Sequence, residues 1–354
     1  MTDLETLVNT ADFEMAARNV LEPGLLGYYA GGAGDERTLI ENVAAFGRRR
    51  LRPRVLVDVS GVSAATTVLG HDVSMPVLVA PTALHRMAHE DGEPGMARAA
   101  AAAGTIYCLS TLATSRPSEV AASAPAAPRW FQVYCFRDSA VTDALVDEAI
   151  DHGFNALVLT VDAPRAGRRE RDFRTGFAVP AEIDMPGVRA ATGAPQCPTP
   201  AEIFGLLDLT ITWDVVERLA SRGLPVIVKG IQTGEDAALA CEHGAAAIVV
   251  SNHGGRQLDG VAASIDVLPE AVDAVDGRLE IYMDGGVRRG TDVLVALALG
   301  ARAVLIGRPA LWGMAVAGEA GALRVLQLLQ AEVELAMTLL GTPAVDAITR
   351  AHLT

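Results

Sequence analysis

The stretch Val249-Val250-Ser251-Asn252-His253-Gly254-Gly255-Arg256-Gln257-Leu258-Asp259 begins as a buried strand and changes abruptly to polar residues and glycine. Its two glycines allow a ligand to approach the backbone closely. Histidine is the residue whose ordinary pKa lies nearest neutral pH, and Arg256 offers a planar pair of donors to a carboxylate. By itself the stretch is explained more simply as a polar strand-to-helix turn. Whether it forms a site depends on how the other strands end.

Eight short aliphatic runs recur along the chain, each followed by polar residues or glycine and then by an alanine-rich helical stretch. The runs are 77–80, 106–109, 130–133, 156–159, 226–228, 247–250, 281–283 and 303–306. Strands that alternate with helices predict right-handed βαβ units, and eight such units predict a closed (β/α)₈ TIM barrel. An open doubly wound sheet is the alternative, but no G-x-G-x-x-G motif follows the first run.

Three segments lie outside this repeat. Residues 1–75 predict an N-terminal helical extension, and residues 178–213 predict a long, proline-containing, lid-like loop after the fourth strand. Beyond Trp312 the apolar spacing predicts a long amphipathic helix that ends near Gly341 and packs on the outside of the barrel. We expect residues 1–354 to form a single domain.

Composition excludes several classes of function. The formal net charge of −14 argues against nucleic acid binding, and the four cysteines form no C-x-x-C pair, so no zinc site or disulfide framework is expected. His85 and His89 have helical spacing but no evident third ligand, so no metal site is predicted. No signal peptide or run of about 18 apolar residues is present, which predicts a cytoplasmic protein without membrane association.

Polar residues and glycines stand at or just after the ends of all eight predicted strands, where a packed interior would be apolar. With the two immediate neighbours of Thr82, they are Pro81, Thr82, Ala83, Ser110, Gln132, Tyr134, Thr160, Asp162, Lys229, Ser251, His253, Arg256, Asp284, Gly285, Gly286, Arg288, Gly307 and Arg308. The C-terminal ends of all strands of such a barrel meet at one face, so these residues are predicted to converge there. The pattern favours an active site.

Two features of this set predict the kind of ligand. The glycines at the last two strand ends, together with Arg288 and Arg308, predict a phosphate site. Lys229 is costly to bury without an anionic or electron-rich neighbour. A Schiff-base lysine would account for it, and so would a flavin.

Residues 251–259, together with Asp284-Gly285-Gly286-Val287-Arg288-Arg289-Gly290-Thr291-Asp292, resemble the FMN-dependent L-2-hydroxy acid oxidase and dehydrogenase family, which includes glycolate, lactate and mandelate oxidases. The similarity extends from about Tyr28 to the C-terminal helix. Further matches are Tyr28-Tyr29-Ala30, Pro81-Thr82-Ala83, Gln132-Val133-Tyr134, Leu159-Thr160-Val161-Asp162, Gly167-Arg168-Arg169, Val228-Lys229-Gly230 and Ile306-Gly307-Arg308-Pro309.

The resemblance implies a role for each matched residue. FMN would be bound by Pro81, Thr82, Ala83, Ser110, Gln132, Thr160, Lys229, Ser251, Asp284, Gly285, Gly286, Arg288, Gly307 and Arg308. The substrate would be bound by Tyr28, Tyr134, Arg169 and Arg256, with Tyr134 and Arg256 also acting in catalysis. His253 would be the base and Asp162 would hold its ring, an arrangement that suits proton removal from a 2-hydroxy acid.

One position departs from the glycolate oxidases, which have a tryptophan where this chain has Leu112. The smaller side chain predicts a substrate bulkier than glycolate, such as lactate or mandelate, although a leucine that merely repacks is an equal alternative.

The expected reaction is oxidation of an (S)-2-hydroxy acid to the 2-oxo acid, with O₂ reduced to H₂O₂. A dehydrogenase that uses a quinone, an FMN-dependent isomerase of a phosphorylated substrate and a non-catalytic flavoprotein are the alternatives. Ser251, His253 and Asp259 lie too close on one turn for a serine-nucleophile triad. The resemblance also implies a homotetramer or homo-octamer.

Overall fold

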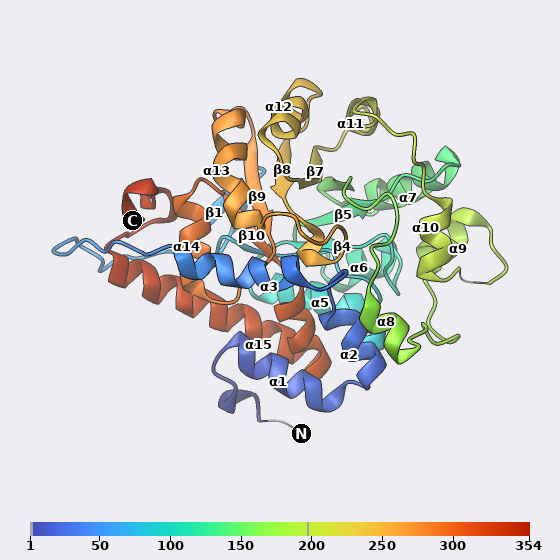
Figure 1. Ribbon diagram of the computed structural model, residues 1–354, viewed down its shortest axis with the longest axis horizontal. Coiled ribbons are helices and arrows are strands. Elements are labelled where there is room, and N and C mark those ends of the chain that lie inside the picture. Colours follow the sequence, from blue (N-terminus) through green and yellow to red (C-terminus); the bar gives the residue numbers. More distant parts are fainter. Residues whose placement is uncertain (1–2, 197) are drawn as a thin grey trace.

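The computed structural model describes residues 3–196 and 198–354, which form a closed barrel of eight parallel strands surrounded by helices (Figure 1). The strands follow the order β10-β3-β4-β5-β6-β7-β8-β9 around the barrel. They are β3 (Val77–Val79), β4 (Tyr107–Leu109), β5 (Arg129–Val133), β6 (Ala156–Thr160), β7 (Val226–Ile231), β8 (Ala247–Val250), β9 (Glu280–Asp284) and β10 (Ala303–Ile306). Each matches one predicted aliphatic run, so the predicted TIM barrel is confirmed.

Helices connect consecutive strands on the outside of the barrel, as right-handed βαβ units require. They are α4 (His85–Ala88), α5 (Gly92–Ala102), α6 (Pro117–Ser123), α7 (Ser139–Asp151), α11 (Asp214–Ala220), α12 (Gly234–Glu242), α13 (Ser264–Val275) and α14 (Gly290–Ala298). The buried apolar residues form two groups, a smaller one inside the barrel and a larger one between the barrel and its helices. Because both faces of each strand are covered, the strands are continuous hydrophobic runs.

The N-terminal extension is helical only in its first part. It contains η1 (Leu4–Thr6), α1 (Thr10–Val20), α2 (Pro23–Ala30), α3 (Arg37–Ala44) and η2 (Ala45–Arg48), followed by the antiparallel pair β1 (Thr66–Val68) and β2 (His71–Val73). Val68 and Val73 belong to the apolar group inside the barrel. The helical extension predicted for residues 1–75 therefore also contains this hairpin, which the sequence did not predict and whose apolar side chains help to fill the barrel interior.

The segment that follows β6 contains more helix than predicted. The helix α8 (Glu170–Thr175) lies before residues 178–213, and α9 (Pro186–Thr192) and α10 (Pro200–Leu206) lie within them. In this segment only Cys197 is outside the described residues. Pro186 and Pro200 each occupy the first turn of a helix, where a missing N–H costs nothing. These prolines begin helices, so the long connection predicted after the fourth barrel strand is present but partly helical.

The last helix, α15, spans Arg308–Leu340 and begins directly after β10. Its backbone is not helical at Ala317 and Gly318, where two helical parts meet at a kink, and Gly341 ends it in the left-handed conformation with φ 78°. The helix packs against α1, α5 and α14 on the outside of the barrel, as Figure 1 shows, which confirms its predicted position.

Candidate active site

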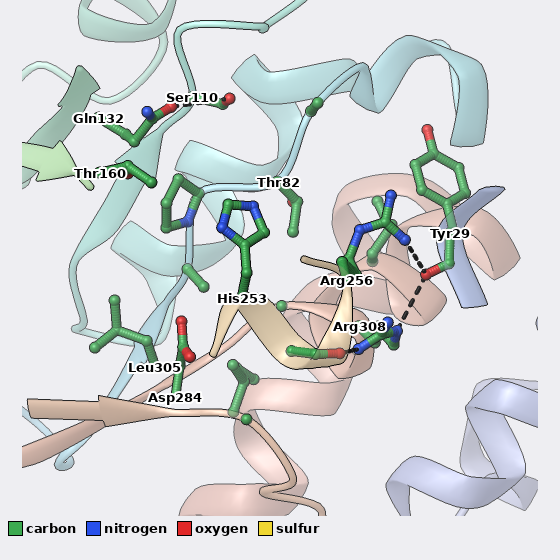
Figure 2. Close-up of a pocket in the computed structure, with 18 of the residues that line it drawn as sticks. Tyr29, Thr82, Ser110, Gln132, Thr160, His253, Arg256, Asp284, Leu305 and Arg308 are labelled. Atoms are coloured by element: carbon green, nitrogen blue, oxygen red, sulfur yellow. Dashed lines mark hydrogen bonds between the residues drawn. The ribbon is translucent and has the colours of Figure 1, made fainter. Parts of the chain in front are cut away.

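A cavity lies at the C-terminal face of the barrel, and residues from the ends of all eight strands line it or support it. Among the predicted residues, its lining includes Tyr28, Pro81, Thr82, Ala83, Ser110, Leu112, Gln132, Tyr134, Thr160, Arg169, Lys229, His253, Arg256, Asp284, Gly285, Gly286, Arg288, Gly307 and Arg308. Figure 2 shows His253 between Ser110, Gln132 and Thr160 on one side and Arg256 and Arg308 on the other. The predicted convergence of the strand ends is therefore present in the structure.

His253 and Asp162 form a hydrogen-bonded pair at the centre of the site. The His253 Nδ1 atom lies 2.9 Å from Asp162 Oδ1, and the two side chains are 23% and 11% exposed. Burial lowers the pKa of His253, and the Asp162 carboxylate opposes this change. Burial alone would raise the pKa of Asp162, but the His253 ring and Lys229 hold it below its ordinary value. A neutral imidazole whose Nδ1–H donates to a carboxylate leaves the Nε2 lone pair free to accept a proton.

The backbone aims the His253 ring into the cavity. His253 has a φ of 58°, an uncommon conformation for a residue with a side chain, and its N–H donates to Ser251 Oγ over 3.1 Å. Strain of this kind occurs where surrounding contacts hold a functional side chain in place.

Lys229 is buried between two partners at the end of β7. Its Nζ lies 3.0 Å from Asp284 Oδ2 and donates to Ser251 Oγ, also over 3.0 Å. Burial would lower the pKa of Lys229, but the Asp284 and Asp162 carboxylates raise it above its ordinary value, so the ammonium stays charged. Ser251 itself is fully buried and does not line the cavity; it supports Lys229 and His253 from behind.

Several polar atoms at the closed side of the cavity have no partner. Gln132 uses its Oε1 atom to accept from Thr111 N over 3.0 Å and from Ser110 Oγ over 3.3 Å. Its Nε2 atom and Thr160 Oγ1 are buried without a hydrogen-bond partner anywhere in residues 3–196 or 198–354. Because an unsatisfied buried polar atom is costly, these atoms indicate a polar ligand.

Arginines without ion-pair partners surround the open side of the cavity. Neither Arg169 nor Arg256 forms a salt bridge with a carboxylate in the part of the chain that the structure describes. Arg256 Nη1 donates to the carbonyl oxygens of Tyr28 over 2.6 Å and Gly31 over 3.0 Å, and its guanidinium lies 5.2 Å from the centre of the Tyr28 ring. Burial and the neighbouring Arg169 lower the pKa of Arg256 to about 10. The site therefore holds positive charge that an anionic ligand would stabilise.

Arg308 and Arg288 occupy the side of the cavity next to β9 and β10. Arg308 donates to the carbonyl oxygens of Tyr29, Gly254 and Gly31 over 3.1, 3.0 and 2.9 Å. Arg256 also donates to the carbonyls of Tyr29 and Gly31, and Figure 2 shows both arginines at the Tyr29 carbonyl. Arg288 donates from Nη1 to the carbonyl of Val287. Burial lowers the pKa of both guanidinium groups, which lack a carboxylate partner within the described ranges.

The residues of the site fit FMN. The unpaired Gln132 Nε2 and Thr160 Oγ1 offer hydrogen bonds to a heteroaromatic ring, and the buried ammonium of Lys229 lies beside them at the strand ends. At the other end, Gly307 precedes α15 and has no side chain to cap it, so the first N–H groups of this helix are open to a phosphate together with Arg288 and Arg308.

The cavity also has lining residues that sequence reasoning missed. They are Tyr29, Ala80, Pro200, Phe204, Gly254, Val287, Leu305, Ile306, Pro309 and Leu311. Most are apolar neighbours of predicted residues. Pro200 and Phe204 come from α10, within the segment predicted to be lid-like, and the proline signals the start of this helix but not its contact with the cavity.

Asp259, which is close to His253 in the sequence, has other partners in the structure. Asp259 accepts the backbone N–H groups of Asp35 and Thr38, so it does not contact His253 as a triad acid would. No cluster of potential metal ligands occurs in the described parts of the chain, and none of its helices is long and apolar enough to cross a membrane.

Comparisons with known proteins agree with this geometry. The sequence pattern of the FMN-dependent dehydrogenase family matches residues 17–354. An L-lactate oxidase from Nostoc sp. is 49% identical over 351 residues, which cover 96% of each of the two chains. Glycolate oxidase 5 from Oryza sativa subsp. japonica is 47% identical over 352 residues, which cover 98% of this chain and 95% of the relative. A solved structure of mandelate oxidase with (S)-4-hydroxymandelic acid superposes with a TM-score of 0.93 at 42% identity, covering 98% of both chains. The chain therefore belongs to the FMN-dependent dehydrogenase family.

Proposed function

We propose that this protein is an FMN-dependent oxidase that converts an (S)-2-hydroxy acid to the 2-oxo acid and reduces O₂ to H₂O₂. The observation that carries the proposal is the free Nε2 of His253, whose ring Asp162 holds at 2.9 Å beside arginines that lack carboxylate partners. The oxidase relatives support the same reaction.

The substrate carboxylate binds between Arg169 and Arg256. Arg256 has one nitrogen occupied by backbone carbonyls, which fixes the guanidinium and leaves its other N–H groups for a carboxylate. Arg169 contributes a buried Nε that has no partner in the described residues. The Tyr28 and Tyr134 side chains line the same region and offer hydroxyl groups to the carboxylate and the 2-hydroxyl.

His253 acts as the base. Its Nε2 accepts a proton from the substrate as two electrons leave the substrate carbon, and Asp162 stabilises the imidazolium that results. The lowered pKa of His253 keeps the ring neutral, and so ready to accept a proton, near neutral pH.

FMN, when bound, supplies the two-electron acceptor for this reaction. The residues that would hold its ring are Pro81, Thr82, Ala83, Ser110, Gln132, Thr160 and Lys229, while Gly285, Gly286, Arg288, Gly307 and Arg308 would hold the ribityl and phosphate end. The charged Lys229 would offer a positive group to the flavin ring as that ring gains negative charge, and Asp284 and Ser251 keep this ammonium in position.

The substrate side chain lies against an apolar wall. Ala83, Leu112, Pro200 and Phe204 line the cavity, and the Phe204 ring lies 5.7 Å from that of Tyr134. This wall suits a methyl or a larger aliphatic or aryl group, so we infer that lactate or a bulkier 2-hydroxy acid is the substrate.

Anaerobic mixing tests the core of the proposal. Purified holoenzyme is mixed with L-lactate, L-mandelate and glycolate, with the D-acids as controls, and the visible flavin band is followed. We expect bleaching by L-acids only. A flavin that no 2-hydroxy acid bleaches would refute the proposal.

The electron acceptor is tested on the reduced enzyme. Rapid return of the flavin band on admitting O₂, with one H₂O₂ formed for each substrate consumed, identifies an oxidase. Slow return with O₂ but rapid return with a quinone would identify a dehydrogenase instead.

We infer that the chain assembles with copies of itself, as a tetramer or octamer, through an apolar arm formed by Val55, Leu56 and Val57. These side chains are 83%, 103% and 40% exposed, and Figure 1 shows their loop extending away from the body beside the end of α15. The arm is held to α15 by the Arg54 N–H, which donates to the Leu340 carbonyl over 2.9 Å.

A groove beside the arm makes the surface self-complementary. Leu335 and Leu339 of α15 line it and are 60% and 69% exposed. Because one chain presents both a projecting apolar arm and an apolar groove, a second copy can place its arm in the groove of the first.

Light scattering of the holoenzyme after size-exclusion chromatography tests this interface. We expect Leu56→Asp and Leu339→Asp each to give smaller assemblies, whereas Met15→Asp on the exposed face of α1 leaves the mass unchanged. A monomeric wild type, or full-sized assemblies of both groove and arm variants, would contradict the inference.

A further inference from the structure

A buried histidine lies just behind the cavity wall and has no part in the reaction outlined above. His85 is fully buried, and its Nε2 lies 2.5 Å from the hydroxyl oxygen of Thr82, which lines the cavity. A buried titratable ring in direct contact with a wall residue can determine what that residue presents to a ligand.

Hydrogen bonds from three directions fix the turn that holds His85. Its N–H donates to Glu93 Oε1 over 3.1 Å, and Glu93 is itself fully buried. The neighbouring Leu84 donates from its N–H to the Leu112 carbonyl over 3.1 Å and accepts at its own carbonyl from the Tyr29 hydroxyl over 2.6 Å. Tyr29 and Leu112 both line the cavity, so the turn is tied to the walls on either side of it.

The surroundings of the ring decide which nitrogen carries its proton. Burial lowers the pKa of His85, so the ring is neutral at neutral pH. Its Nδ1 is buried and has no hydrogen-bond partner in the described ranges. A buried N–H without a partner is rarer than a buried acceptor without one. This favours the tautomer that carries its proton on Nε2 and donates it to the Thr82 oxygen.

Thr82 is held on its other side as well. A Cβ atom added at Gly307 would lie 3.2 Å from the Thr82 methyl carbon, so this methyl group packs against the backbone at the start of α15. With the methyl directed at Gly307 and the oxygen directed at His85, the side chain has one rotamer. In this tautomer His85 does not need the hydroxyl hydrogen of Thr82, so that hydrogen can be donated to a group in the cavity that Thr82 lines.

We propose that His85 is a positioning residue that makes the Thr82 hydroxyl a hydrogen-bond donor toward an acceptor atom of the flavin ring. This inference rests on the proposed binding of FMN, but not on the identity of the substrate. Reduction makes the flavin ring more electron-rich, so a donated hydrogen bond stabilises the reduced form more than the oxidised form. His85 thereby raises the reduction potential of the bound FMN.

The midpoint potential of the bound flavin tests the proposal without any 2-hydroxy acid. The wild type, His85→Leu, His85→Gln and Thr82→Val are titrated anaerobically against a reference dye. Loss of one ordinary hydrogen bond should reduce the preference for reduced over oxidised FMN by roughly fivefold, which at about 30 mV per tenfold for two electrons is a fall of about 20 mV. We expect this fall in His85→Leu and in Thr82→Val.

The other variants separate positioning from a merely structural role. Glutamine can place an amide N–H where Nε2 lies, so His85→Gln should keep the wild-type potential. The double variant His85→Leu with Thr82→Val should show no further fall, since both single changes remove the same bond. If His85→Leu loses FMN or fails to fold, His85→Phe, which keeps a buried ring but has no N–H to donate, takes its place, and the same fall in potential is expected.

Two outcomes would overturn the proposal. An unchanged potential in Thr82→Val would show that the hydroxyl does not act on the flavin. A lowered potential in Thr82→Val together with wild-type potential in a folded His85→Leu protein would show that His85 does not position it. If no 2-hydroxy acid reduces the flavin of the wild-type protein, the proposed function is refuted. The midpoint potentials of the variants would still test the role of His85.

Discussion

Replacing Asp162 by asparagine tests the role of the His253–Asp162 pair, because it keeps the size of the side chain and removes its charge. The contact is a buried, charge-assisted hydrogen bond of 2.9 Å. Such bonds contribute about 1.5–3 kcal/mol, and most of that free energy is gained when the ring becomes an imidazolium. At about 1.36 kcal/mol for each factor of ten, the rate of flavin reduction should fall roughly 10- to 150-fold.

The pH dependence of the same variant has a defined direction. His253 accepts a proton only when neutral, so the rate rises with pH through the pKa of this ring. Asp162 raises that pKa against the effect of burial. Removing the carboxylate lowers the pKa further, and the acid limb of the profile should move to lower pH while the plateau falls.

Stopped-flow measurement of anaerobic flavin reduction from pH 5 to 9 gives both quantities. Asp151→Asn, on the exposed C-terminal turn of α7, is the matched control and should change neither. A plateau equal to that of the wild type, or an acid limb displaced to higher pH, would refute the reasoning about this pair.

Three further predictions follow from the cavity walls. Leu112→Trp should fill space beside the substrate and lower kcat/KM for mandelate at least tenfold relative to glycolate. Equal losses for both acids would instead indicate that position 112 does not contact the substrate side chain. Lys229→Met leaves Asp284 buried without its partner at 3.0 Å, so we expect the free energy of unfolding to fall by about 3–5 kcal/mol and FMN to be retained less well. Chemical denaturation and the flavin content of the purified protein measure these two effects. Lys229→Arg should lose less. Gly286→Ala would place a Cβ 1.9 Å from the Asn42 carbonyl oxygen at a φ of 91°, so it should yield little folded holoenzyme, and a normal melting temperature would contradict the close approach.

The barrel could be predicted because its signal is local. Each buried strand is a short aliphatic run, and its burial on both faces makes the run continuous, as in residues 247–250. The hairpin at Thr66–Val73 was missed because three-residue strands carry too little alternation to be recognised, and its place in the core depends on the barrel interior that surrounds Val68.

Most of the candidate site could be named from strand ends, since parallel strands of a closed barrel must deliver their C-terminal residues to one face. Ser251 shows the limit of that rule. The resemblance implies contact between Ser251 and FMN, which stays a prediction, while in the structure the Ser251 hydroxyl is buried and accepts from Lys229 over 3.0 Å. Which side of a strand end faces the cavity depends on the twist and packing of neighbouring strands.

The sequence by itself determined the number and order of the barrel strands, the absence of a nucleic acid-binding charge balance, and a set of polar residues that includes His253 and Arg256. Only the tertiary structure decided which of these atoms remain without partners. The 2.9 Å contact between His253 and Asp162, which leaves His253 Nε2 free, joins positions 91 residues apart. The contact through which the His85 ring directs the Thr82 hydroxyl joins positions 3 residues apart. The physical reason is that protonation state and donor direction are set by burial and by neighbours in space, which no local pattern of residues contains.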